Sequence, residues 1–274
     1  MNRIDYAKEV CKHVNNYGYS TEIHENYRNN GSYVAITVKP TPDCKVAPVF
    51  TIGDESDDPI IFASKILTFI PAEIDTDSLE DIMFDKEEVL NRCSYILVNS
   101  KLNESRTSLV RRPICKTLEL QYKLDVSDIL EGGRISLEHK HIEKLGITED
   151  ELYVHAFANT MEHFPYKLQS LGEMLGCDIL EEVPKMYVLT NEQQVNGAGA
   201  ILYKGMKEVL EETVGDEFLA IPSSVHEWII IPAILGEKEL TTMIRDVNSS
   251  VLREDEVLSD RPYELISDGV LFER

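Results

Sequence analysis

Apolar residues recur at helical spacing near the N-terminus, at Ile4, Ala7, Val10, Cys11 and Val14. This spacing predicts an amphipathic helix. Polar and apolar positions then alternate in two segments, STEIHENY and SYVAITVKP, as is typical of strands. Between them, Asn30-Gly31 predicts a tight hairpin, because both residues tolerate positive φ. A third short strand is predicted in APVFTIG, and a helix in DPIIFASKILTFIP. The chain therefore opens with mixed α and β structure.

Further strands are predicted in CSYILVNS, CKTLELQYKLDV and KMYVLTN. Helices are predicted from the Thr148 cap onward, in YKLQSLGEMLG up to Gly176, in GAILYKGMKEVLEETVG and in EKELTTMIRDVNSSVL. Two strands with a Pro-Ser turn between them are predicted in EFLAIPSSVHEWIIIP, and a closing hairpin in RPYELI and GVLFE. The predicted fold class is α+β, with mixed sheets and packed helices. The glycines of SDILEGGRIS mark a predicted boundary between an N-terminal lobe, 1–126, and a C-terminal lobe, 134–274.

The composition of this 274-residue chain indicates in which cellular compartment it works. Apolar runs stay well short of the roughly 18 residues that span a bilayer, so we predict no membrane segment. Acidic residues interrupt the N-terminal stretch where a signal peptide needs an apolar segment, which favours a cytoplasmic protein. Five cysteines without a CxxC pair favour reduced thiols.

The net charge of -22 repels the phosphates of nucleic acids, so we predict no direct binding to DNA or RNA. Acidic residues are concentrated between 54 and 88, and we expect the binding residues there to be Asp75, Asp77, Glu80 and Asp81. One interpretation is a surface that binds a basic host or phage protein. The other is a solvated face that keeps the protein soluble.

The segment PSSVHE carries candidate catalytic residues. On a strand, Ser224 and His226 would share one face, and a hydrolase would need a distant acid, for which Asp260 is the candidate. Ser223, Glu227 and Asn196 are the candidate binding residues around this pair. The G-x-S-x-G elbow is missing, which favours instead a hydrogen-bonded entrance to a buried strand.

Other motifs are incomplete. His155 and His163 lie eight residues apart on one predicted helix, and the pair His139 and His141 lacks an evident third ligand. Glycines at 197 and 199 do not continue into a phosphate-binding loop. We therefore predict neither a metal site nor a cofactor. The only concentrated basic spot contains Arg106, Arg111 and Arg112, which either holds an anion or compensates the acidic surface.

Six further stretches stand out, namely RNNG, YILVNSKLNE, ISLEHKHIEKLGITEDELYVHAFANT, MYVLTNEQQVNGAGAILY, PSSVHEWIIIP and VLSDRPYEL. Together they resemble a bacterial domain family of unknown function, frequent in Firmicutes and often carried on mobile elements. The resemblance covers nearly the whole chain and implies no biochemical role. The positions that match the family motifs are Asn30, Gly31, Asn99, Asn103, Asn159, Asn196, Gly197, Pro222, Ser223, Ser224, His226, Glu227, Ser259 and Asp260.

Together these observations predict a non-enzymatic, acidic protein-binding module. An anti-defence or host-modulating inhibitor from a mobile element is one form of it. The alternative is a hydrolase that uses the Ser/His pair of PSSVHE. The oligomeric state is left open.

Overall fold

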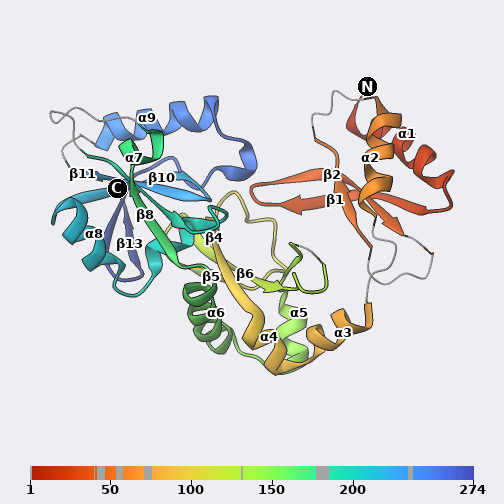
Figure 1. Ribbon diagram of the computed structural model, residues 1–274, viewed down its shortest axis with the longest axis horizontal. Coiled ribbons are helices and arrows are strands. Elements are labelled where there is room, and N and C mark those ends of the chain that lie inside the picture. Colours follow the sequence, from red (N-terminus) through yellow and green to blue (C-terminus); the bar gives the residue numbers. More distant parts are fainter. Residues whose placement is uncertain are drawn as a thin grey trace.

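The computed structural model describes residues 2–39, 41, 47–53, 58–70, 76–130, 132–176, 185–233 and 237–274. In these ranges the strands form three sheets, each with helices packed against it (Figure 1). All recorded strand pairs are antiparallel. The α+β prediction is confirmed. We call the parts built around the three sheets the first, second and third units, in chain order.

The first unit is a three-stranded sheet with two helices. Its elements are α1 (Arg3–Asn15), β1 (Ser20–Arg28), β2 (Gly31–Lys39), β3 (Val49–Thr51) and α2 (Pro59–Phe69). Asp58 caps α2, and Pro59 fits its first turn, where no backbone N–H is needed. The predicted hairpin forms one residue earlier than expected. Arg28 pairs with Gly31, so the turn is Asn29-Asn30, and Asn30 has a φ of 61°.

The second unit has β6 at the centre of its sheet. Its elements are α3 (Thr76–Phe84), α4 (Lys86–Arg92), β4 (Cys93–Asn99), β5 (Arg111–Pro113), β6 (Leu118–Asp125), β7 (Arg134–Ser136), α5 (His139–Leu145) and α6 (Glu149–His163). β6 pairs with β4, β5 and β7. The connection that we predict as a lobe boundary therefore joins two neighbouring strands, β6 and β7, of one sheet. The helix predicted from Thr148 is α6, and the Thr148 hydroxyl accepts the Glu151 N–H.

The third unit is a sheet in the order β13-β12-β10-β11-β9-β8. Its elements are β8 (Tyr166–Ser170), α7 (Leu171–Leu175), β9 (Tyr187–Asn191), the 3₁₀ helix η1 (Gly197–Leu202), α8 (Met206–Val214), β10 (Phe218–Ser224), β11 (Glu227–Pro232), α9 (Glu237–Ser250), the 3₁₀ helix η2 (Glu254–Glu256), β12 (Tyr263–Ser267) and β13 (Val270–Glu273).

Three local predictions are corrected in this unit. The residues Tyr166–Ser170 form an edge strand rather than the start of a helix, because they pair with β9. Likewise, the helix predicted from Gly199 is divided, since Gly205 has a φ of 82° between η1 and α8. The turn expected at Pro222-Ser223 lies instead at Val225-His226, because Pro222 and Ser223 continue β10.

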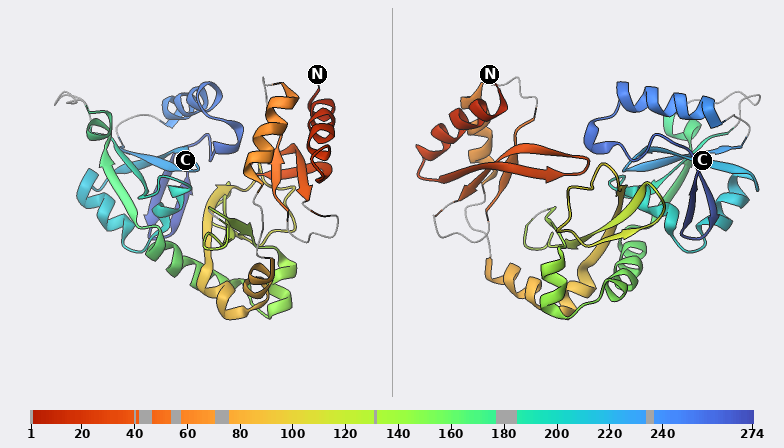
Figure 2. Two further views of the ribbon diagram at one scale, coloured as in Figure 1. Left: turned by 45° about the vertical axis from the view of Figure 1, so that its right-hand side comes forward. Right: turned by 180° about the vertical axis from the view of Figure 1, so that it is seen from behind.

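The second and third units share one hydrophobic core, whereas the first unit has its own. One cluster of buried side chains runs from Leu79 to Leu271, a separate cluster lies within residues 6–66, and a smaller third cluster lies within residues 219–244 of the third unit. The β1–β2 hairpin extends from the first unit toward the other two, as Figure 1 and the view from behind in Figure 2 show. Among the described residues, no helix has both the length and the apolar character needed to cross a bilayer.

Candidate functional site

The two faces of β6 differ in chemistry. Leu118, Leu120, Tyr122 and Leu124 point to the shared core. Glu119, Gln121 and Lys123 occupy the alternate positions and therefore the opposite face. Neighbouring strands extend this second face, because Arg111 lies opposite Gln121 and Ser136 lies opposite Lys123. The sheet thus carries a row of polar and charged groups on the side away from its core, which we call the polar face.

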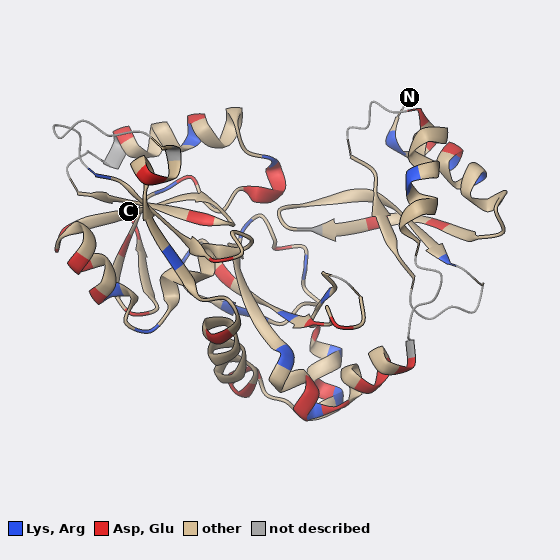
Figure 3. Ribbon diagram, viewed as in Figure 1, with Lys and Arg blue, Asp and Glu red and all other residues tan. Residues whose placement is uncertain are grey.

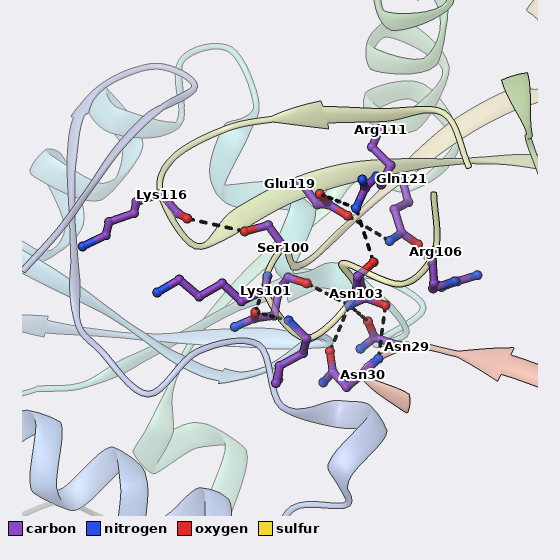
Figure 4. Close-up of polar contacts among 12 residues, drawn as sticks. Asn29, Asn30, Ser100, Lys101, Asn103, Arg106, Arg111, Lys116, Glu119 and Gln121 are labelled. Carbon is purple, nitrogen blue, oxygen red and sulfur yellow. Dashed lines mark hydrogen bonds and ion pairs between the residues drawn. The ribbon is translucent and has the colours of Figure 1, made fainter. Parts of the chain in front are cut away.

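A network of asparagines joins the hairpin tip to the edge of the polar face (Figure 4). Asn103 is fully buried in the loop that follows β4. Its Nδ2 donates to Asn29 Oδ1 at 2.9 Å, to Asn30 Oδ1 at 3.0 Å and to Asn99 O at 2.8 Å. Its Oδ1 accepts the Asn30 N–H at 3.2 Å. The buried amide of Asn103 therefore links the first unit to the second.

The same hairpin tip also contacts the third unit. Asn30 Nδ2 donates to the carbonyls of Glu254, at 2.8 Å, and Val257, at 2.6 Å. Asn29 Nδ2 donates to the carbonyl of Asp255 at 2.7 Å. All three units meet where the hairpin ends, beside the polar face.

A cavity of about 460 Å³ opens at this junction. Ile96, Val98 and Val225 form its apolar part. Its polar and charged lining comes from all three units, namely Tyr27, Asn29, Arg106, Lys123, Ser136, Asn196, His226, Arg253, Asp255 and Glu256. The cavity has the volume of a small-molecule site and combines an apolar part with convergent polar groups.

Two cations in this cavity have only neutral hydrogen-bond partners. Arg106 Nη1 donates to Gln121 Oε1 at 3.0 Å, and Lys123 Nζ donates to Ser136 Oγ at 2.7 Å. Among the described residues, no carboxylate oxygen lies within the 4.0 Å ion-pair distance of either cation. The carboxylate of Glu119 on the same face instead lies 3.5 Å from Arg111 Nη1 and accepts a hydrogen bond from Gln121.

Burial changes the acidity of both cations. Burial, together with the charges of Arg106 and Arg134, lowers the pKa of Lys123 to about 8. Burial also lowers the pKa of Arg106, an effect that Glu119 opposes and Arg111 strengthens. Each positive charge is therefore held where water solvates it poorly and where it repels another cation.

His226 lies in the turn between β10 and β11, with its ring in a fixed orientation. Its Nδ1 accepts the Asn196 N–H at 2.9 Å, so the proton of the neutral ring is on Nε2. That Nε2 lies 3.8 Å from Glu256 Oε1. Gly197 permits this close packing, because a Cβ there would lie 2.6 Å from the His226 carbonyl oxygen.

The candidate catalytic residues contact different partners. Ser224 Oγ accepts the backbone N–H of His226 at 3.0 Å, whereas the ring of His226 faces Asn196 and Glu256. Asp260 forms an ion pair of 2.8 Å with Arg245. The structure thus brings Asn196 to His226, but the recorded bonds do not join Ser224, the His226 ring and Asp260 in one relay.

The remaining candidates around PSSVHE pair with each other. Ser223 Oγ donates to Glu227 Oε1 at 3.1 Å. Neither of these residues lines the cavity that contains His226. Across the described part of the chain, no group of three or more His, Cys, Asp or Glu side chains is arranged to hold a metal ion.

A family model described as a family of unknown function, DUF5688, matches residues 4–266. The chain belongs to this family. No curated protein and no solved structure matches the chain.

The predicted acidic surface of this DUF5688 protein is described in part. Asp77 and Asp81 are exposed on α3, and Glu80 on the same helix is half-buried. Figure 3 shows acidic residues gathered along α3 and α4, at the edge of the second unit. Asp75 lies outside the described residues, as does the segment 54–57.

Sequence reasoning missed Lys123, Gln121 and Ser136. The signal was present in LELQYKLD, where a polar or charged residue occupies every second position of a strand. That pattern predicts a half-buried strand with one face in water. Here the polar face is covered by the hairpin tip and by the loop that contains Arg106.

Proposed function

We propose that this protein is a binding module for a small anionic ligand, which occupies the cavity between β6, the β1–β2 hairpin tip and the Val225-His226 turn. The observation that carries the proposal is the pair Arg106 and Lys123, two cations that share one cavity and have only neutral hydrogen-bond partners. A phosphate or carboxylate group would supply the missing negative charge.

Charge balance supports this choice of ligand. Acidic residues outnumber basic ones by 49 to 27, so acidic partners are abundant in this chain. A cation that is withdrawn from water without a carboxylate partner lowers the stability of the folded protein. Charge-assisted hydrogen bonds from an arginine and a lysine to an anion offset that cost and fix the orientation of the ligand.

The lining also supports a ligand with an apolar part. Ile96, Val98 and Val225 lie in the same cavity as the two cations. Burial of apolar ligand surface adds roughly 25 cal/mol per Å². A small organic phosphate or carboxylate therefore fits the lining better than an inorganic anion does.

Calorimetric titration with inorganic phosphate at pH 7 and low ionic strength tests the proposal. We expect Lys123→Met and Arg106→Gln each to raise the Kd by tenfold or more, about 1.4 kcal/mol. Arg245→Gln, which removes a cation from the surface, is the matched control and should leave the Kd unchanged. Equal binding by all four proteins, or no binding by the wild type, would contradict an anion site at Arg106 and Lys123.

The acidic surface on α3 supports a second proposal, a contact with a basic protein partner. An inhibitor carried on a mobile element is one form of this function. Asp77 and Asp81 lie one helical turn apart, both exposed, next to Phe84, which is 50% exposed. A charged rim beside an exposed aromatic ring is typical of protein interfaces.

Capture of partners from host lysate, with washes at low and high salt, tests this second proposal. The variant Asp77→Asn, Glu80→Gln, Asp81→Asn should lose a salt-sensitive basic partner that the wild type retains. A control with Glu208→Gln, Glu212→Gln and Asp216→Asn, in and just after α8, removes the same number of charges elsewhere and should retain the partner. Retention by the α3 variant would exclude this surface.

The hydrolase alternative receives less support from the geometry. The hydrogen bond recorded between Ser224 Oγ and His226 involves the backbone N–H of His226 rather than its ring. Hydrolysis by a serine requires a base within hydrogen-bond reach of the hydroxyl. Ligand binding in the cavity needs no such relay.

A further inference from the structure

Lys123 has the surroundings of a nucleophilic amine. It lies on the polar face of β6, lines the cavity, and donates through Nζ to the neutral Ser136 Oγ at 2.7 Å. A carboxylate partner would hold the ammonium form in place, and the described residues place none within ion-pair distance. The neutral amine, which carries the reactive lone pair, is therefore accessible near physiological pH.

The charged groups around Lys123 favour the neutral amine. Arg106 and Arg134 both repel its ammonium form. The other titratable or charged residues of the cavity are Tyr27, His226, Arg253, Asp255 and Glu256. Of these, the two carboxylates are engaged by Arg253, at 3.5 Å from Asp255 and 2.7 Å from Glu256.

We propose that Lys123 forms an imine with an aldehyde that carries an anionic group, and that Arg106 binds this anionic group. The inference rests on the proposed anion site and names the chemical class of its ligand. Arg106 takes the anionic group, so that the carbonyl carbon is left to face the Lys123 amine. The apolar side chains Ile96 and Val98 then contact the body of the ligand.

The chemistry of this step is balanced without an oxidant or reductant. The lone pair on the neutral Nζ attacks the carbonyl carbon, a C–N bond forms as the C=O π bond breaks, and one proton passes from Nζ to the carbonyl oxygen. The resulting carbinolamine loses its hydroxyl group as water while Nζ loses its remaining proton, which leaves a C=N bond. One amine and one aldehyde therefore give one imine and one water.

Pyridoxal 5′-phosphate is a suitable probe, because it combines an aldehyde with a phosphate. The full-length protein is incubated with less than one equivalent, the imine is reduced with borohydride, and labelled peptides are mapped by mass spectrometry. We expect Lys123 to carry most of the label and to react at least about tenfold faster at pH 7.5 than lysines with an ordinary pKa near 10.4. Its rate should approach a plateau above pH 8 to 9.

Variants separate a specific imine from general labelling. Lys123→Arg keeps the positive charge and should lose the label, whereas Lys101→Arg, in an exposed loop, should keep it. Circular dichroism melting of each variant shows that it is folded. Label spread evenly over surface lysines, or unchanged total labelling of Lys123→Arg, would overturn the imine at Lys123.

Pyridoxal, which lacks the phosphate, separates the imine from the anion site. We expect it to label Lys123 at least tenfold more slowly than the phosphate ester does, and Arg106→Gln to remove most of that difference. Equal rates for the two aldehydes would overturn the role of Arg106 while leaving the amine reactive. Phosphate binding by calorimetry without any label on Lys123 would overturn the imine and leave the anion site standing.

Discussion

Arg106 and Arg112 come from one short basic segment but reach opposite faces of the second unit's sheet. Arg112 lies opposite Leu120, on the face that packs against α6. Its Nη1 is 2.6 Å from Glu149 Oε2 and 3.0 Å from Asp150 Oδ1, and its guanidinium lies 4.1 Å from the centre of the Tyr153 ring. Arg106 reaches the cavity, where its recorded partner is the neutral amide of Gln121.

The surroundings shift the pKa values of the two guanidinium groups in opposite directions. Burial alone would lower the pKa of Arg112, but its bonds to Glu149 and Asp150 outweigh burial and raise the pKa. Burial lowers the pKa of Arg106, and Glu119 offsets this only in part. A compensated cation of this kind supports the fold, whereas an uncompensated one in a cavity is available to a ligand. Of the two alternatives for the basic spot, charge compensation therefore describes Arg112, whereas the anion site that we propose uses Arg106.

The largest change in the free energy of unfolding is expected at the Asn103 network, where the hairpin tip covers the polar face. Asn103→Ala removes bonds to Asn29, Asn30 and Asn99 and leaves buried polar groups without partners. We expect it to lower the free energy of unfolding by about 2 to 4 kcal/mol. Urea unfolding measures the loss, and Asn91→Ala, at an exposed position, is the control. Stability equal to that of the control would mean that the Asn103 network does not hold the hairpin tip over the polar face.

The next largest loss of stability is expected when Arg112, which is paired with carboxylates, is replaced. Arg112→Met leaves Glu149 and Asp150 without their cation and removes the contact with Tyr153. We expect a loss of about 1 to 3 kcal/mol in urea unfolding, because the pair is only partly buried. A gain in stability would contradict the claim that the ion pairs of Arg112 stabilise the fold.

Removal of Lys123, a cation without a carboxylate partner, should change the stability with the opposite sign. Lys123→Met removes a partly buried ammonium and should stabilise the unliganded protein at pH 7 by about 1 to 2 kcal/mol. In the folded protein the pKa of Lys123 is lowered to about 8, from the ordinary lysine value of 10.5 that applies to the unfolded chain. Between these values the unfolded chain holds the extra proton, so wild-type stability rises with pH and the variant's advantage shrinks. An advantage that stays constant from pH 8 to 10.5 would argue against a desolvated lysine.

The smallest effect is expected for a cation on the open surface. Arg245 pairs with Asp260 at 2.8 Å, and their side chains are 55% and 49% exposed. Arg245→Gln should change the free energy of unfolding by less than about 0.5 kcal/mol. A loss comparable to that of Arg112→Met would show that burial does not separate these ion pairs.

Local patterns in the sequence predict most of the fold. The helix caps at Asp58 and Thr148, and the αL glycine at 176, act through neighbouring residues, and their helices end or begin as expected. The errors occur where the local structure depends on residues that are distant in the sequence. Tyr166–Ser170 becomes a strand through β9, and the bulge between Pro222 and Ser224 moves the turn to His226.

The site is less predictable than the fold, for a physical reason. The basic spot containing Arg106 is visible in the sequence, but its lack of a carboxylate partner depends on side chains from other segments. Lys123 follows an alternation that usually means a face in water. Only the meeting of Asn29, Asn103 and the 254–257 segment covers that face and creates the cavity.

The pKa of Lys123, measured by NMR of its side-chain Nζ and Cε nuclei with and without phosphate, tests the central claim most directly. We predict a pKa of about 8 in the free protein and an upward shift when phosphate binds, because a nearby anion favours the ammonium form. A pKa near the ordinary lysine value of about 10.4 that phosphate does not change would contradict an uncompensated cation pair in an anion site.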